Sequence, residues 1–296
     1  MQGGSITSKQ RHVWIYLSPW LITLFIFWAY PFAHSLYLSF TDYELLAKSS
    51  SFVGIANYTR LLQDSDFLRA LLNTAVFVLG TIPFTTVIAL VLALLVNQKL
   101  PGAKIFRSGY FIPSITSLVV IALIFTNLYS KGGYLTLLCD MVGIPTPERG
   151  FLFSEGTALA SIMVMDIWIA SGYYMLLFLA ALKSIPCEHY EAAAIDGASG
   201  WRSFWSITLP QLRPMMLYVV LINTIKSFQV FVEIYVMTKG GPLNSTLTAV
   251  YFVYDRGLHR FDMGYASAAA YILFILIMIF ALLQMRVFGI ERGTAE

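Results

Sequence analysis

Six long apolar runs alternate with short polar segments along this chain of 296 residues. Each run is close to the roughly 20 residues that a helix needs to cross about 30 Å of bilayer hydrocarbon, and too long for a strand of a membrane barrel. No internal repeat or long linker divides the chain, so we predict a single all-α integral membrane domain over residues 1–296. The six predicted transmembrane helices are residues 13–40, 71–96, 105–129, 157–182, 215–237 and 265–288.

The composition agrees with this prediction, because 58% of the residues are hydrophobic and only 12% are charged. Soluble chains carry about 25% charged residues. The first run is too long for the apolar part of a secretory signal and lacks a small-residue cleavage pattern, so we expect it to remain as a span. A net charge of +3 without a basic cluster gives no support for nucleic acid as a partner.

Basic residues indicate how the spans are oriented, because cytoplasmic loops carry an excess of lysine and arginine. With six spans, both termini lie on one side. That side, with the loops near 97–107 and 183–214, holds ten basic residues: Lys9, Arg11, Lys99, Lys104, Arg107, Lys183, Arg202, Arg213, Arg286 and Arg292. The other side holds eight, in longer segments: Lys48, Arg60, Arg69, Lys131, Arg149, Lys239, Arg256 and Arg260. We therefore expect both termini in the cytoplasm.

The two long segments on the predicted outer side differ in character. In residues 41–69 the apolar positions predict an amphipathic helix near Ala56–Gln63, which would lie along the membrane surface or cover the spans. Residues 130–155 are rich in glycine and proline and predict turns with one short helix. Cys139 falls in this second segment and Cys187 in an inner loop, so the predicted topology excludes a disulfide between them.

A polar island, EAAAIDGASGWRSFWSITLPQLRP, lies between the fourth and fifth apolar runs. Pro186 ends the preceding helix, because proline disfavours helical geometry in the residue before it. Glu188 then begins a short helix, whose N-terminal end favours a negative side chain. Gly197 and Gly200 permit a tight reversal that a side chain would obstruct.

A second short helix is predicted after the reversal. Trp201, Phe204 and Ile207 give it an apolar stripe at helical spacing. We expect Leu209-Pro210 to end it. A short helix with small residues and an acidic face, projecting from the membrane, is well shaped to sit in a groove of another protein. The alternative is an ordinary amphipathic helix on the inner leaflet.

The spacing within the island resembles the cytoplasmic EAA loop of permease subunits of ATP-binding-cassette (ABC) importers. It reads Glu-Ala-Ala, three residues, Gly, nine residues, Ile-x-Leu-Pro. The stretches FVGIANYTRLL, SFQVFVEIYVMTKGGP and GYASAAA look like those of carbohydrate-type permeases of the maltose and glycerol-phosphate importer group. The resemblance covers nearly the whole chain and implies a type I importer permease fold, with a cytoplasmic coupling loop at residues 185–212.

The resemblance also implies the partners and the location of the chain. A substrate-binding protein outside, a second similar permease subunit and two ATPase subunits inside would complete the importer, in a bacterial inner membrane. In this family the coupling helix docks onto the ATPase subunit. The residues that we expect to couple are Glu188, Glu191, Ala192, Ala193, Asp196, Gly197, Ile207, Leu209 and Pro210.

We find no catalytic or metal-binding motif in the sequence. No Gly-Lys pair occurs, so a phosphate-binding loop of the GxxxxGK type is absent. The histidines at positions 12, 34, 189 and 259 lack metal-ligand spacing, and no GxSxG turn occurs. We therefore expect no enzyme activity, metal or cofactor in this chain, with ATP and Mg bound by the partner ATPase subunits.

Three charged residues fall within predicted spans: Asp166, Lys226 and Glu233. A charge at membrane depth costs about 3 kcal/mol, so such residues usually face a water-filled cavity or one another. Lys226 and Glu233 are seven residues apart and would share a helix face. Asp166 and Lys226 could instead pair between helices.

Carbohydrate recognition uses planar donors and acceptors together with aromatic rings. Tyr174 and Phe231 offer rings in the same spans. Our candidate substrate-binding residues are Glu233, Gln229, Asn223, Lys226, Asp166, Trp168, Tyr173 and Phe228.

We hypothesise an ATP-driven, binding-protein-dependent sugar importer subunit that forms half of a translocation pathway by alternating access. One alternative is an ion-coupled secondary transporter, with Asp166 and Glu233 as ion sites and with inverted repeats, which we do not find. A second is an ABC permease for glycerol phosphate, which would favour Lys226 at the cavity. A membrane enzyme is a third, and the missing catalytic residues argue against it.

Overall fold

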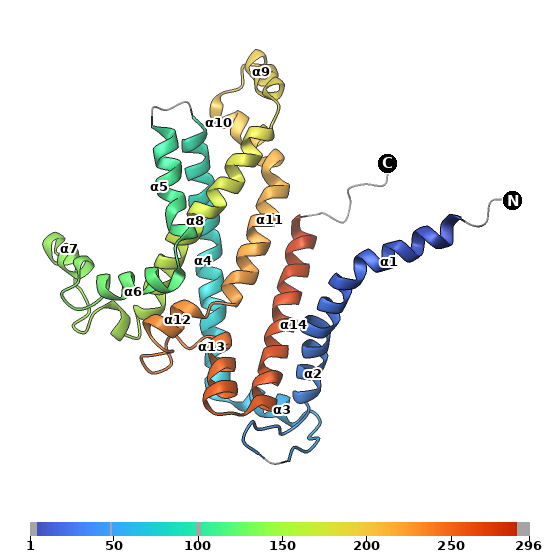
Figure 1. Ribbon diagram of the computed structural model, residues 1–296. Helices are drawn as coiled ribbons and strands as arrows, with labels where there is room; N and C mark the ends of the chain where they lie inside the picture. The colour runs from blue at the N-terminus through green and yellow to red at the C-terminus, as the bar shows by residue number, and fades with distance from the viewer. Residues whose placement is uncertain (1–4, 48, 99–101, 289–296) are drawn as a thin grey trace. The chain divides into compact units, whose positions relative to one another are not determined.

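The computed structural model describes residues 5–47, 49–98 and 102–288, with side chains from residue 13 onward (Figure 1). Within these ranges the chain is helical, and it has isolated β-bridges but no strand. Five of the described helices are long and apolar enough to cross a membrane, and a bent pair of helices makes a sixth. The predicted all-α membrane fold is therefore confirmed. Lys48, Lys99 and Arg292, which enter the orientation count, lie outside the described residues.

The chain divides into two compact units, Met1–Gln63 with Val253–Tyr271 and Asp64–Phe252 with Ile272–Glu296. The first unit contains the first predicted span. This span runs through α1 (Ser5–Leu24), the π-helical turn η1 (Phe25–Ala29) and α2 (Tyr30–Leu38).

The amphipathic helix predicted near Ala56–Gln63 is α3 (Ala56–Gln63). The buried Asn57 of α3 donates hydrogen bonds to the carbonyls of Ser39 (3.0 Å) and Thr41 (2.8 Å), and so ties α3 to the end of α2. Arg60 lies 4.3 Å from the centroid of the fully buried Tyr265 ring. The π-helical turn η4 (Asp255–His259) precedes Tyr265 in the same unit.

The second unit is built on α4 (Ser65–Asn97), α8 (Ala158–Ser184) and α11 (Leu209–Phe228), and α4 and α8 form its most extensive helix pair. Small residues of α4, Ala89 and Ala93, let large side chains such as Phe178 of α8 pack closely. The part of α14 (Met263–Phe288) from residue 272 onward belongs to this unit. Phe228 and Leu273 share a second apolar cluster.

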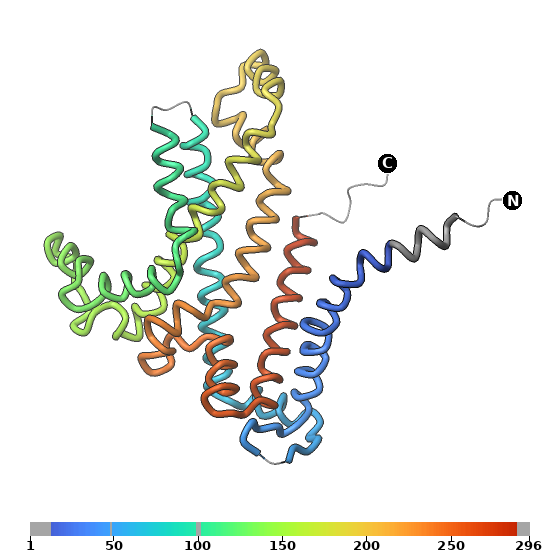
Figure 2. The backbone as a smooth tube through the Cα atoms, in the orientation of Figure 1, coloured from blue at the N-terminus to red at the C-terminus, as the bar shows by residue number. Residues whose placement is uncertain are grey.

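The third predicted span is not one straight helix. It consists of α5 (Ala103–Ile115) and α6 (Leu118–Leu128), which are bent by 99° at a break (Figure 2). At the break, Thr116 has extended backbone geometry and Ser117 has φ −55° and ψ 124°, so neither residue is helical. Thr116 Oγ1 donates to the carbonyl of Ile112 (2.9 Å), which satisfies one backbone group that the interrupted helix leaves without its usual partner.

The fifth predicted span is interrupted as well, because α11 ends at Phe228 and the next helix, α12 (Val232–Met237), begins after a three-residue break at 229–231. The prediction that Lys226 and Glu233 share one face of a regular helix is therefore wrong, because the helix does not continue between them.

The polar island also departs from prediction at its end. The predicted stop at Leu209-Pro210 is wrong, because α10 (Gly200–Ser203), the π-helical turn η3 (Phe204–Thr208) and α11 follow one another without a break. Pro210 is the second residue of α11 and directly follows the π-helical turn η3, so the helix continues through it.

In the second unit, the segments predicted to lie outside the membrane are short helices and turns. The glycine- and proline-rich stretch contains α7 (Tyr134–Val142) and the short 3₁₀ turn η2 (Phe151–Phe153), as expected for turns with one short helix. The helix α13 (Ala249–Tyr254) follows the segment after α12.

Candidate functional site

A cavity of about 620 Å³ lies in the second unit, between α4, α5, the start of α6, α8, α11 and α12. Six of the eight predicted substrate-binding residues line it: Asp166, Tyr173, Asn223, Lys226, Gln229 and Glu233. Tyr174 and Phe231, the two further aromatic residues noted in the predicted spans, also line the cavity. The structure therefore brings together most of the polar residues that the sequence places in the membrane.

The two interrupted spans shape this cavity. The break after α11 turns Gln229, Phe231 and Glu233 onto its wall, and the end of α5 contributes Ser114. Ser114 Oγ donates to the carbonyl of Ile169 in α8 (2.7 Å), which holds α5 against α8 at the cavity. Irregular backbone at membrane depth occurs only where protein or a water-filled cavity surrounds it.

The charged residues in the cavity do not neutralise one another by direct contact. Among the described residues, Asp166 and Lys226 form no ion pair, so the pairing that the sequence left open is absent here. The Lys226 ammonium lies 5.1 Å from the centroid of the Tyr173 ring, within reach of a cation–π interaction. Glu233 is buried, with 6% of its surface exposed.

Within the part of the chain that the structure describes, two buried polar groups on the cavity wall have no hydrogen-bond partner: the Tyr174 hydroxyl and the Asn223 side-chain nitrogen. Both residues are at most 2% exposed. A buried donor without a partner is costly, so such groups usually meet water or a ligand. These two groups can therefore donate hydrogen bonds to a polar molecule in the cavity.

Two predicted substrate-binding residues do not line the cavity. Trp168 packs on Phe125 with ring centroids 5.5 Å apart, and Phe228 packs on Phe280 at 5.1 Å. Conversely, Phe77, Phe111 and Ser114 line the cavity and were not predicted. Phe77 lies in an apolar stretch of α4, and Phe111 and Ser114 lie in the uncharged second half of α5, so the sequence offers no signal that would single them out.

The polar island contains one further short helix before α10, namely α9 (Cys187–Ile195). It begins after Pro186, as predicted, and ends in a turn in which Gly197 has φ +71°. The amides of Gly197 and Ala198 donate to the carbonyls of Ala194 (3.1 Å) and Ala193 (2.9 Å). This pattern caps the helix and requires the left-handed conformation that glycine adopts most easily.

The two short helices are largely uncovered. Glu188, Glu191, Ala192 and Asp196 are exposed, and Ile195 and Trp201 are 87% and 72% exposed. Exposed apolar side chains beside acidic ones are typical of a surface that another protein covers.

The island is attached to the helix bundle at few points. Tyr190 and Thr208 are joined by a hydrogen bond of 3.0 Å between their hydroxyls, and Ile207 packs against the core of α4, α8 and α11. Leu209 and Pro210 continue into α11. These contacts connect α9 to the end of α11, a helix that lines the cavity.

The chain is similar to known transport permeases over most of its length. It is 35% identical over 274 residues to the multiple sugar-binding transport system permease protein MsmF of Streptococcus mutans serotype c, covering 92% of this chain and 93% of that protein. It is 30% identical over 270 residues to the sn-glycerol-3-phosphate transport system permease protein UgpA of Yersinia pestis, covering 90% of each.

The fold is also similar to a solved structure, a bacterial alginate ABC transporter in complex with an alginate pentasaccharide-bound periplasmic protein. The TM-score is 0.85 over 98% of each chain, at 22% sequence identity. Residues 63–289 match the family described as binding-protein-dependent transport system inner membrane component. This chain, a multi-pass membrane protein, belongs to that family of transport permeases, whose members are not enzymes.

Proposed function

We propose that this chain is the transmembrane subunit of an ATP-driven importer that receives a neutral sugar or oligosaccharide from a binding protein. The cavity of about 620 Å³ carries this proposal, because it combines polar side chains with aromatic rings. Its size is within the range of about 300–1,000 Å³ that is usual for small-molecule sites.

The lining suits a sugar ring in its chemistry. Gln229, Asn223 and the carboxylates offer donors and acceptors for hydroxyl groups, and Tyr173 and Phe231 offer flat apolar faces for the C–H surface of a sugar ring. The unpartnered Tyr174 hydroxyl supports this reading, because a sugar hydroxyl would give it a partner.

The charges in the cavity favour a neutral substrate over glycerol phosphate. Two carboxylates, Asp166 and Glu233, face one ammonium, Lys226. A phosphate ester carries a charge of about −1.5 to −2 at neutral pH, which is more than the single ammonium of Lys226 can balance. Because one relative, UgpA, is named as a glycerol-3-phosphate transport permease, the experiment below also tests glycerol 3-phosphate.

The polar island is proposed to couple transport to ATP hydrolysis in partner subunits. In this scheme both termini and the island lie in the cytoplasm, and α9 docks into a groove of an ATPase subunit that binds ATP and Mg. Closure of two such subunits would draw the coupling loops of two permease subunits together and turn the cavity outward, where the binding protein delivers its sugar. Hydrolysis would reset the pathway. Such a cycle needs a substrate or nucleotide that binds the two states with different affinity.

The ion-coupled alternative makes a different demand on the molecule. A secondary transporter would need no partner on α9 and α10, so the exposed Ile195 and Trp201 would have no function there. Its transport would follow an ion gradient and would be independent of ATP.

A reconstituted importer tests the proposal. The chain, its partner permease, the ATPase subunits and the binding protein are placed in liposomes, and uptake of radiolabelled maltose, lactose and glycerol 3-phosphate is measured with and without internal ATP. We expect ATP-dependent uptake of a neutral sugar. Uptake of glycerol 3-phosphate and not of a sugar, or uptake that follows an ion gradient without ATP, would reject the proposal of an ATP-driven sugar importer.

A further inference from the structure

The segment 238–248, which joins α12 to α13, has an irregular backbone. Lys239, Leu243 and Asn244 have φ angles of +51°, +47° and +60°. Residues with a side chain adopt this region rarely, and they persist there only where surrounding contacts fix the backbone. The shape of this connecting segment must therefore be set by its neighbours.

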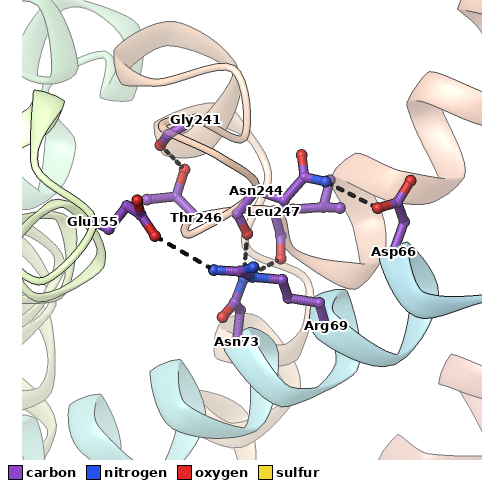
Figure 3. A network of polar contacts seen from close by, with 8 residues as sticks. All are labelled: Asp66, Arg69, Asn73, Glu155, Gly241, Asn244, Thr246 and Leu247. Atoms are coloured by element: carbon purple, nitrogen blue, oxygen red, sulfur yellow. Dashed lines mark hydrogen bonds and ion pairs between the residues drawn. The ribbon is translucent and has the colours of Figure 1, made fainter.

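Side chains from the first turns of α4 supply those contacts (Figure 3). The Asn73 side-chain nitrogen donates to the carbonyls of Asn244 and Leu247, both at 2.9 Å. The Asn244 side chain in turn donates to an Asp66 carboxylate oxygen, also at 2.9 Å. Asn73 thus anchors two carbonyls of the connecting segment with a single amide group.

Threonine hydroxyls complete the hold on this segment. Thr246 donates to the carbonyl of Gly241 (2.7 Å, Figure 3) and is hydrogen-bonded to Thr238 (2.8 Å), which closes the segment on itself. Thr74 of α4 accepts a hydrogen bond from the amide of Ala249 (2.9 Å). The segment therefore behaves as a rigid piece attached to α4.

One side chain connects this rigid piece to the cavity. The hydroxyl of Thr248, which is fully buried, donates to the carbonyl of Val230 at 3.2 Å. Val230 lies in the break between α11 and α12 and lines the cavity. A carbonyl in irregular backbone at membrane depth needs a partner, because the interrupted helix does not supply the usual backbone N–H.

The position of the break decides where the cavity's polar groups lie. Gln229 and Phe231 flank Val230, and Glu233 follows in the first turn of α12. A shift of the Val230 carbonyl would move these side chains together. The chain of contacts therefore runs from Asn73 through the connecting segment and Thr248 to the residues that face the substrate.

We propose that Thr248 is a positioning residue for the cavity, anchored through the connecting segment by Asn73. Thr248 does not touch the substrate, and it acts by holding the break at 229–231 in the conformation that directs Gln229 and Glu233 inward. This inference rests on the proposed function for the identity of the ligand, and on the contacts alone for the geometry.

Two substitutions at Thr248 distinguish a role of its hydroxyl group from a role of its side-chain volume in core packing. Thr248→Val keeps the shape and removes the hydroxyl, whereas Thr248→Ser keeps the hydroxyl and removes a methyl group. Asn73→Asp keeps the size and removes the donor. Thr86→Val is the matched control, because the Thr86 hydroxyl donates only to Ile82 in its own helix.

The first measurement needs no ligand. Hydrogen–deuterium exchange of peptides covering 228–237 and 187–208 is followed in the complete importer in lipid nanodiscs. We expect Thr248→Val and Asn73→Asp to speed exchange in 228–237 by about fivefold, as the loss of one hydrogen bond implies. Exchange in 187–208 should not change, and Thr248→Ser and Thr86→Val should behave as wild type.

The second measurement uses maltose or lactose with the binding protein. Thr248→Val should raise the sugar concentration for half-maximal uptake by about fivefold while maximal ATP hydrolysis stays within twofold, and Thr248→Ser should restore it. Equal exchange in all variants, or a loss that Thr248→Ser shares, overturns the positioning role. A wild-type importer that takes up neither sugar rejects the proposed function instead, and the exchange comparison still decides the role of Thr248.

Discussion

The cavity and the polar island are two regions of one compact unit that are built in opposite ways. The island is a contiguous segment of exposed residues, and its shape follows from local signals such as Pro186 and Gly197. The cavity gathers residues from six helices, and its shape depends on contacts between segments far apart in the sequence. The difference teaches that docking surfaces can be coded locally, whereas a binding cavity inside a bundle cannot.

The largest effect is expected where two helices meet at the cavity wall. A Cβ atom at Gly172 would lie 1.9 Å from the carbonyl oxygen of Tyr110, which is backbone of α5. Gly172→Ala should therefore push α5 away from α8 and destabilise the chain by about 3 kcal/mol, the upper end for overpacking. Thermal inactivation of the purified importer measures this. Gly109→Ala on α5 is the control, because its Cβ would meet nothing within 4 Å. Equal stability of the two variants would contradict the close packing of these helices.

The next effect concerns the turn of the polar island. Gly197 has φ +71°, and a Cβ there would meet no atom within 4 Å, so any cost is backbone strain and not crowding. Gly197→Val should cost about 1–2 kcal/mol locally and abolish sugar-stimulated ATP hydrolysis. Gly197→Asn should keep most of it, since asparagine tolerates this conformation. If valine and asparagine reduced hydrolysis equally, the strain account would be wrong.

A smaller effect is expected for a polar group in the cavity. Glu233→Gln replaces a carboxyl group, whose two oxygens can accept hydrogen bonds from sugar hydroxyls, with an amide. Uptake at low sugar concentration should fall about tenfold, with the complex still assembled. The control is Trp168→Leu. Trp168 was predicted from the sequence as a substrate contact, but its ring packs on Phe125 outside the cavity. An effect of Trp168→Leu as large as that of Glu233→Gln would show that the cavity is misassigned.

The smallest effect concerns the attachment of α9. Tyr190→Phe removes the hydrogen bond to Thr208 and should cost about 1 kcal/mol or less, because the bond joins two neutral hydroxyl groups. We expect stimulated ATP hydrolysis to fall by no more than about fivefold, and basal hydrolysis to stay unchanged. Thr208→Val should reproduce the result, and the double variant should be no worse than either single variant. An additive loss would mean that the two hydroxyls act independently.

Much of the fold could be predicted because it is specified by local pattern. The helix α3 spans the residues predicted for it, and the apolar runs became α4, α8 and α14 with only small changes at their ends. The helix α9 and the turn at Gly197 follow from a proline, an acidic first turn and a glycine within a dozen residues.

The breaks in the third and fifth spans could not be predicted, because their causes lie far away in the chain. Ser114 is held by the carbonyl of Ile169, and the carbonyl of Val230 is satisfied by Thr248. An apolar run looks the same in sequence whether it is straight or interrupted. The cavity residues Phe77 and Phe111 were missed for the same reason, since only the packed bundle distinguishes them from lipid-facing or core aromatics.

The measurement that tests the account most directly compares uptake and ATP hydrolysis in the same liposomes for Glu233→Gln and Gly197→Val. Binding and coupling are assigned to different regions, so the two variants should fail differently. Glu233→Gln should lose uptake at low sugar concentration while hydrolysis stimulated by the binding protein persists, and Gly197→Val should lose both together. The same ratio of uptake to hydrolysis in both variants would contradict the separation of a substrate cavity from a coupling loop.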